Sequence, residues 1–272
     1  MSGPVLLVGC GKMGGAMLGG WLDRGLAADS VHIVEPFADN AAAAAKLGVN
    51  VYNAPGDLPA DLAPAVVIFA VKPQQMADAA PAFSGFTASA VYLSIAAGTP
   101  ISTFENFLGS DAAIVRSMPN TPAAVRRGIT VACPNDNVSD EQRALCHDML
   151  EAVGDVGWVD DEGLIDAVTA TSGSGPAYVF LLIECLAKAG QEAGLSAEMA
   201  MQLAAATVSG AGELARQADD EAATLRKNVT SPGGTTAAAL EVLMAESDGL
   251  QQLMTRAVAA AADRSRELAK LA

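Results

Sequence analysis

The order of strands and helices along the chain constrains its fold more than any other feature. Up to about Glu162, short β-branched runs alternate with alanine-rich helical stretches. Strands that alternate with helices form a mostly parallel sheet covered by helices on both faces. The predicted strands are Val5–Gly9, Val31–Val34, Val49–Tyr52, Ala65–Val71, Val91–Ile95, Ile114–Arg116, Ile129–Ala132 and Val156–Val159, and the early helices are Met13–Arg24 and Asp39–Leu47.

After Glu162 the alternation stops and alanine and leucine recur at helical spacing. The predicted helices are Pro176–Gly194, Ala197–Arg216, Glu221–Asn228, Thr235–Ala245 and Leu250–Leu271. We therefore expect an α/β domain over residues 1–162 and an all-α domain over residues 163–272. Helices with so many small residues form a thin bundle, and such a bundle often needs a partner subunit to cover its apolar faces.

A glycine-rich turn follows the first predicted strand. Gly9, Gly11 and Gly14 close that strand and open the next helix, with Lys12 and Met13 between the last two glycines. In this context the glycines permit a tight turn, close approach of the backbone to a pyrophosphate, and close helix–strand packing. The pattern favours a Rossmann-like dinucleotide site over a merely flexible turn. Lys12 either adds charge beside the phosphates or is simply solvated.

An acidic residue at the end of the second strand bears on the choice of cofactor. Glu35 lies 21 residues after Gly14, where a carboxylate can accept hydrogen bonds from ribose hydroxyls and would repel a 2′-phosphate. No Arg or Lys lies between Glu35 and Lys46 to hold that phosphate. These features favour NAD(H) over NADP(H), although the following Pro36 leaves open that Glu35 points away from the ligand.

Two further strand ends are candidates for cofactor contact. Small residues at the carboxyl end of a strand let a flat ligand lie against the backbone. Lys72 either orients a phosphate or ribose or extends into solvent at the strand terminus. The residues concerned are Val71, Lys72 and Pro73 after the fourth strand, and Ala96, Ala97 and Gly98 after the fifth.

A second glycine-rich segment interrupts the helical region. It reads Ser231-Pro232-Gly233-Gly234-Thr235-Thr236, at the expected start of a helix. The backbone N–H groups of Gly233, Gly234 and Thr235 would form an anion-binding helix end, aided by the helix dipole. Two such turns in one chain indicate a two-ligand enzyme, with a phosphate-bearing ligand at one turn and a smaller anion at the other.

Composition excludes several classes of function. A net charge of −15 argues against nucleic acid or an anionic membrane as a partner. The four cysteines are scattered without a CxxC pair, so neither a metal site nor a disulfide framework is expected. No apolar run reaches membrane-spanning length. We expect a soluble, cytoplasmic enzyme that acts on a small molecule.

Six motifs in matching order resemble the pyrroline-5-carboxylate reductase family. They are the N-terminal glycine fingerprint, VKPQ, SIAAG, RSMPNTP, SGSGPAY and VTSPGGTT, and they run the length of the chain. The resemblance implies NAD(P)H-dependent reduction of the C=N bond of 1-pyrroline-5-carboxylate to L-proline, the last step of proline biosynthesis. It also implies a homodimer through the C-terminal helices, with higher assembly built on it. The family often prefers NADPH, whereas Glu35 favours NADH.

The resemblance also suggests roles for individual residues. It places the substrate carboxylate on the loop of Ser231, Gly233, Gly234 and Thr235. The Thr236 hydroxyl would lie beside the imine nitrogen as a hydrogen-bond partner or proton donor. A threonine here can instead cap or pack the first helical turn. Asn120 and Ser174 are further candidates for substrate contact, although Asn120 can serve only a turn and Ser174, like Ser172, only a helix cap.

The positions of the two histidines bear on which type of reduction the chain can catalyse. His32 lies within a predicted strand and His147 in a polar stretch far from every motif, so neither is expected to be catalytic. Ketone and alcohol dehydrogenases need a positioned acid or base at oxygen, whereas an imine can be protonated before hydride arrives. The alternatives are a β-hydroxyacid dehydrogenase that uses Lys188, and a catalytically silent dinucleotide-binding regulator, for which the second glycine segment would have no use.

Overall fold

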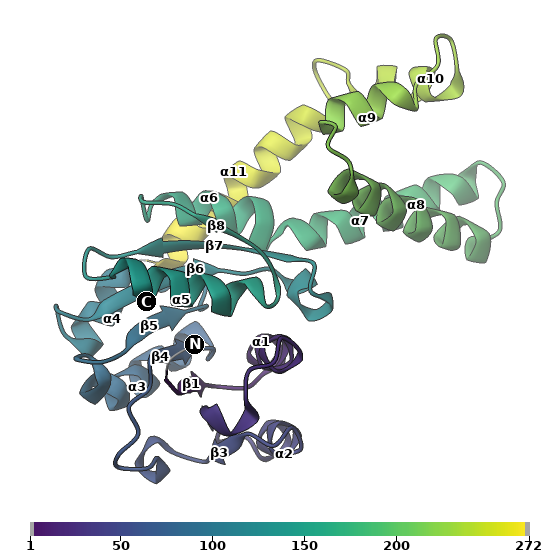
Figure 1. The fold of residues 1–272 in the computed structure, drawn as a ribbon. Helices are drawn as coiled ribbons and strands as arrows, with labels where there is room; N and C mark the ends of the chain where they lie inside the picture. Colours follow the sequence, from purple (N-terminus) through teal and green to yellow (C-terminus); the bar gives the residue numbers. More distant parts are fainter. Residues whose placement is uncertain (1–2, 270–272) are drawn as a thin grey trace. The chain divides into compact units, whose positions relative to one another are not determined.

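The computed structural model describes residues 3–269 and divides into two units (Figure 1). The first unit takes in the chain up to Gly173 and again from Ala261 onward, and the second is Ser174–Ala260. Within residues 3–269, no helix is long and apolar enough to cross a lipid bilayer.

The first unit is built on one eight-stranded sheet of order β3-β2-β1-β4-β5-β6-β7-β8. All neighbouring strands run parallel except β6 and β7, which are antiparallel. The order of the first six strands is that of a doubly wound dinucleotide-binding fold. The predicted α/β fold with a mostly parallel sheet is confirmed. The strands are β1 Val5–Val8, β2 Val31–Val34, β3 Asn50–Tyr52, β4 Val66–Phe69, β5 Val91–Ser94, β6 Ala113–Met118, β7 Gly128–Pro134 and β8 Gly154–Trp158.

Helices cover the two faces of this sheet, and alternate strand residues explain how. Leu7 of β1 packs with Trp21 of α1 and Met149 of α5, whereas its neighbour Leu6 faces the opposite cluster, which contains Phe104 of α4. Strands that are buried on both faces need the continuous apolar runs seen in this sequence. The helices of this unit are α1 Lys12–Asp23, α2 Ala38–Ala45, α3 Met76–Ala79, α4 Ile101–Leu108, α5 Asp140–Glu151 and α6 Leu164–Val168.

The second unit is helical, as the sequence predicts. Its small core is formed by Ala187 of α7 with Ala200 and Ala204 of α8, against which Ile183 packs. Large apolar side chains such as Phe180 and Leu181 remain exposed on α7. The helices after Gly173 are α7 Gly175–Glu192, α8 Ala197–Gln217, α9 Ala222–Asn228, α10 Thr235–Leu243 and α11 Leu250–Ala269. The predicted end of the last helix at Leu271 lies outside the described residues.

The units divide later in the chain than the boundary predicted at residue 162. Helix α6 belongs to the first unit because Ile165 is only 1% exposed and lies in the cluster that contains Phe104. The end of α11 also belongs to the first unit, where the Ser265 hydroxyl donates to Asp166 Oδ1 at 2.6 Å. Packing and a polar contact thus join residues 163–173 and 261–269 to the sheet.

Candidate active site

A cleft of about 510 Å³ opens at the carboxyl ends of β1, β2 and β4. In open α/β sheets, ligands bind where the order of strands reverses, and here β1 lies between β2 and β4. Glycine backbone, apolar side chains and a few polar side chains form its walls. The lining residues are Val8, Gly9, Gly11, Val34, Glu35, Pro36, Phe37, Asn40, Asn53, Ala54, Pro55, Ala70, Val71, Lys72, Gln75, Asp78, Ala79 and Phe83.

The three fingerprint glycines occupy different surroundings. Gly9 has a φ of 88°, and a Cβ there would lie 2.9 Å from Val71 Cγ1. A Cβ at Gly14 would lie 2.6 Å from the Gly9 carbonyl oxygen, so Gly14 permits close contact between α1 and the turn. A Cβ at Gly11 would meet nothing within 4 Å, and Gly11 lines the cleft. This open approach to the Gly11 backbone fits a dinucleotide pyrophosphate.

Helix α1 starts directly beside this opening. Gly11 is the N-cap of α1 and has no side chain that could accept from the N–H groups of the first turn. Lys12 is the exposed first residue, and the half-buried Met13 packs against the core on the α1 face of the sheet. Burial, reinforced by the charge of Glu35, raises the pKa of the Cys10 thiol to about 11. The thiol therefore stays protonated near neutral pH and is unsuited to act as a nucleophile.

The Glu35 carboxylate already has hydrogen-bond donors from the protein. Its Oε2 accepts the backbone N–H of Cys10 at 2.7 Å and the side-chain amide of Asn40 at 3.3 Å. Its Oε1 accepts the backbone N–H of Phe37 at 2.8 Å. Glu35 lines the cleft but is only 2% exposed. The predicted ribose acceptor therefore has contacts within the protein that the sequence did not indicate.

The other expected cofactor residues divide between the cleft and its surroundings. Val71 and the exposed Lys72 line the cleft, whereas Pro73 begins the 3-10 turn Pro73–Gln75 that follows them. The segment after β5 lies outside the lining. Its Ala96 N–H donates to Ser94 Oγ at 3.2 Å, Ala97 is exposed, and Gly98 has a φ of 74°. Gly9, Gly11, Glu35, Val71 and Lys72 are thus the expected cofactor residues that share the cleft.

Two motif segments that lie far apart in sequence meet in the first unit. The side-chain amide of Asn120 donates to Ser172 Oγ at 3.2 Å, and Asn120 Oδ1 accepts the N–H of Ile129 at 3.0 Å. A Cβ at Gly173 would clash with the terminal methyl of Met118. Asn120 is therefore more than a turn residue, because it joins the RSMPNTP and SGSG segments.

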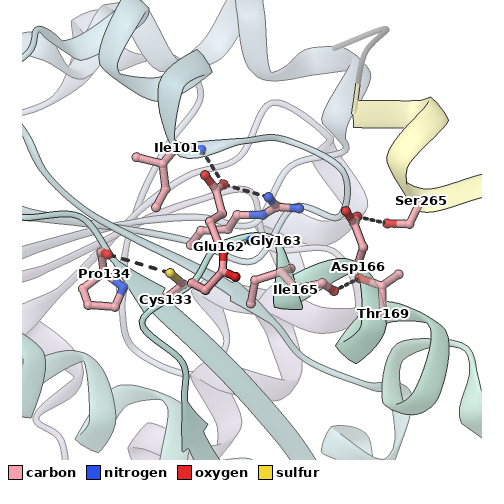
Figure 2. Close-up of polar contacts among 11 residues, drawn as sticks. Ile101, Cys133, Pro134, Glu162, Gly163, Ile165, Asp166, Thr169 and Ser265 are labelled. Carbon is pink, nitrogen blue, oxygen red and sulfur yellow. Dashed lines mark hydrogen bonds and ion pairs between the residues drawn. The ribbon is translucent and has the colours of Figure 1, made fainter. Parts of the chain in front are cut away.

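A partly buried ion pair in this region was not predicted from the sequence. Arg116 of β6, whose side chain is 6% exposed, donates from Nη1 to Glu162 Oε1 at 2.7 Å. The same Glu162 oxygen accepts the N–H of Ile101 at 2.8 Å, at the start of α4 (Figure 2). One carboxylate thus connects the chain just after SIAAG, the RSMPNTP strand and the approach to α6. An arginine inside an apolar strand was the available signal, because a buried charge requires a partner.

The second glycine-rich segment, residues 231–236, lies in the second unit. Gly233 has a φ of 67°, Gly234 is the N-cap of α10, and α10 begins at Thr235 with no side-chain cap. The N–H of Gly234 donates to the Ser231 carbonyl at 3.0 Å, which corrects the expectation that this amide is available to an anion. A Cβ at Gly234 would clash with Ser231 Oγ, a side-chain atom that can rotate away, and would lie 3.2 Å from the Ser231 carbonyl oxygen. Thr236 is partly exposed in the first helical turn, and Ser174 is the N-cap of α7 without a side-chain cap.

Both histidines lie outside the cleft lining. His32 Nδ1 and the Tyr52 hydroxyl are 3.1 Å apart on adjacent strands, and burial lowers the pKa of this imidazole. Trp158 donates from its indole N–H to His147 Nδ1 at 3.3 Å. These contacts agree with structural roles for both rings.

Two family models match separate parts of the chain. A family model described as pyrroline-5-carboxylate reductase dimerisation matches residues 162–268. Another, described as NADP oxidoreductase, coenzyme F420-dependent, matches residues 4–98. A pyrroline-5-carboxylate reductase of Pseudomonas aeruginosa is 40% identical over 273 residues, which cover 99% of this chain and 98% of that relative. The chain belongs to the pyrroline-5-carboxylate reductase family.

Solved structures of pyrroline-5-carboxylate reductases share the fold over nearly the whole chain. That of Coxiella burnetii has a TM-score of 0.92 at 33% identity and covers 98% of this chain and 99% of its own. That of Plasmodium falciparum, which has NADP bound, has a TM-score of 0.81 at 29% identity and covers 98% of each chain. The resemblance in the six motifs is thereby confirmed as membership of the pyrroline-5-carboxylate reductase family.

Proposed function

We propose that this protein reduces 1-pyrroline-5-carboxylate to L-proline with NADH or NADPH, the last step of proline biosynthesis. The observation that carries the proposal is the cleft at the carboxyl ends of β1, β2 and β4, with the unobstructed backbone of Gly11 at its wall. Full-length similarity to pyrroline-5-carboxylate reductases supports the same reaction. A dinucleotide-binding regulator would have no use for the second glycine segment.

The residues present fit a dinucleotide. Gly9 and Gly11 would hold its pyrophosphate together with the N–H groups at the start of α1, Gly14 would keep α1 close to the turn, and Lys72 would add a positive charge in the cleft. When bound, the reduced nicotinamide supplies a hydride to the C=N carbon of the substrate. Among the lining residues, Lys72 carries the positive charge, and Glu35 and Asp78 carry carboxylates.

We assign the substrate to the glycine segment of the second unit. The substrate carboxylate would bind at the start of α10, through the N–H groups of Gly233 and Thr235 and the hydroxyl of Ser231, with support from the helix dipole. The Thr236 hydroxyl would hydrogen-bond the substrate nitrogen. Because the imine takes up its proton before hydride arrives, the protein need supply only orientation and this hydrogen bond. Asn120 and Ser174 remain candidates for further polar contacts.

The direct test is oxidation of reduced nicotinamide by the purified full-length protein after 1-pyrroline-5-carboxylate is added. We expect one equivalent of L-proline for each NADH or NADPH consumed, measured in parallel assays with the two cofactors. Lys188→Ala is expected to keep this activity, because that lysine is exposed on α7 and belongs to the rival hydroxyacid reaction. No oxidation with either cofactor would reject the proposal.

We also infer that residues 163–272 supply substrate binding and dimerisation, and that the protein is a homodimer or a larger assembly of dimers. Exposed apolar side chains on the second unit include Phe180, Leu181 and Leu182 of α7, and its core is small. Burying such a surface against a second copy is favourable. Light scattering is expected to give at least twice the 27.5 kDa of one chain, and a monomer at micromolar concentration would contradict the inference.

A further inference from the structure

The side chain expected to read the cofactor ribose is engaged elsewhere in the structure. Glu35 directly follows β2, and its carboxylate receives the N–H of Cys10, which precedes it by 25 residues, at 2.7 Å. It also receives the N–H of Phe37 at 2.8 Å and the amide of Asn40 at 3.3 Å. One buried carboxylate thus joins the glycine turn after β1 to the start of α2.

The number of acceptor positions limits what else Glu35 can do. An ionised carboxylate offers about four lone-pair sites, two on each oxygen. Oε2 already accepts from Cys10 and Asn40, and Oε1 accepts from Phe37. With the residue 2% exposed, little capacity remains for ribose hydroxyls. Selection against a 2′-phosphate by direct contact requires an acceptor that faces the ligand.

The Cys10 contact has a clear consequence for the turn. Cys10 lies between Gly9, which adopts a φ of 88°, and Gly11, the N-cap of α1. Holding the Cys10 N–H toward Glu35 fixes the orientation of the peptide between Gly9 and Cys10. The following N–H groups at the start of α1 are then positioned for a phosphate, which both dinucleotides carry in their pyrophosphate.

We propose that Glu35 is a positioning residue. Its hydrogen bonds link the glycine turn to the start of α2, and it does not select between NADH and NADPH. The proposal rests on the proposed function only in assuming that the cleft binds a nicotinamide dinucleotide. It reverses the prediction from the position of Glu35 in the sequence, because three protein N–H groups offset the charge that would repel a 2′-phosphate.

The test measures binding without turnover. Calorimetric titration of the ligand-free, full-length protein gives the Kd of NADH and of NADPH for wild type and Glu35→Gln. The amide keeps one acceptor oxygen but leaves one of the two backbone N–H groups without its carboxylate partner. We expect both Kd values to rise by a common factor of about tenfold, the size of one charge-assisted hydrogen bond. The ratio of the two Kd values is expected to change less than about threefold.

Asp78→Asn is the charge-matched reference, because Asp78 lines the same cleft and is exposed. It removes one negative charge and leaves the hydrogen bonds of Glu35 in place. A change in the ratio of the two Kd values that both variants share is therefore an effect of charge alone. Glu35→Asp retains the charge but is too short to keep the Cys10 contact, and it is expected to weaken both cofactors. A shift of more than about threefold toward NADPH in Glu35→Gln, beyond that in Asp78→Asn, would overturn the proposal.

The two proposals can fail separately. If wild type binds neither dinucleotide, the proposed function is wrong, and the melting temperature of the ligand-free protein then decides the role of Glu35. If the hydrogen bonds of Glu35 hold the turn, Glu35→Gln should have a lower melting temperature than Asp78→Asn, because these contacts exist without ligand. Equal melting temperatures in the two variants would contradict it.

Discussion

Thr236→Ala is expected to lower kcat/KM for 1-pyrroline-5-carboxylate by about 100-fold, the typical effect of removing one hydrogen-bonding group at a reacting centre. Thr236 lies in the first turn of α10, directly after the residues assigned to the substrate carboxylate. Cofactor binding is assigned to the first unit, so the Kd of NADH or NADPH should change less than about twofold. Steady-state kinetics and calorimetric titration of the same preparation measure both quantities.

Thr236→Ser is the matched control, because serine retains the hydroxyl and loses only a methyl group. Its kcat/KM is expected to stay within about fivefold of wild type, since the hydrogen bond to the substrate nitrogen is kept. If Thr236 serves only to pack the helix start, both the alanine and the serine variant should have a lower melting temperature than wild type. The alanine variant should then keep its activity. That pattern would remove Thr236 from the reaction.

Gly11→Val is expected to raise the Kd of both dinucleotides at least about 100-fold while the protein remains folded. Gly11 has a φ of −72°, which any residue can adopt, and a Cβ there would meet no protein atom within 4 Å. The branched side chain would therefore fill space in the cleft rather than disturb the core. Calorimetric titration and thermal unfolding of the ligand-free protein separate these two effects.

Gly19→Ala provides the control for Gly11. Gly19 lies within α1, and a Cβ there would also meet nothing within 4 Å. Alanine in a helix interior is more stable than glycine by about 1 kcal/mol, so this variant should melt at the same or a higher temperature and keep its cofactor affinity. A Gly11→Val variant that binds NADH and NADPH as tightly as wild type would show that the dinucleotide does not approach this backbone.

Local signals in the sequence were sufficient for much of the fold. The alternation of apolar runs with alanine-rich stretches predicted all eight strands to within a few residues, and helical spacing predicted α7 to α11. Four helices of the first unit, α3 to α6, were not predicted. Of these, α5 carries a recognisable signal, a capping box in which Ser139 accepts the N–H of Gln142 at 3.3 Å and Gln142 accepts that of Ser139 at 3.0 Å.

Other features could not be read from local pattern because their partners are distant in sequence. Arg116 and Glu162 pair across 46 positions, and Ser265 and Asp166 across 99. Such contacts depend on which strand ends and helices the fold brings together. They also explain why α6 and the end of α11 join the first unit rather than the helical one.

The sequence by itself determined the class of fold, the two glycine segments and the family, because these depend on periodicity and on residue order along the chain. Only the tertiary structure decided what the polar groups of those segments contact. It directed Glu35 at the Cys10 N–H and the Gly234 N–H at the Ser231 carbonyl. A residue type shows that a group can accept or donate a hydrogen bond. Its partner follows from the three-dimensional path of the backbone, since each buried polar group must be satisfied by whatever the fold places beside it.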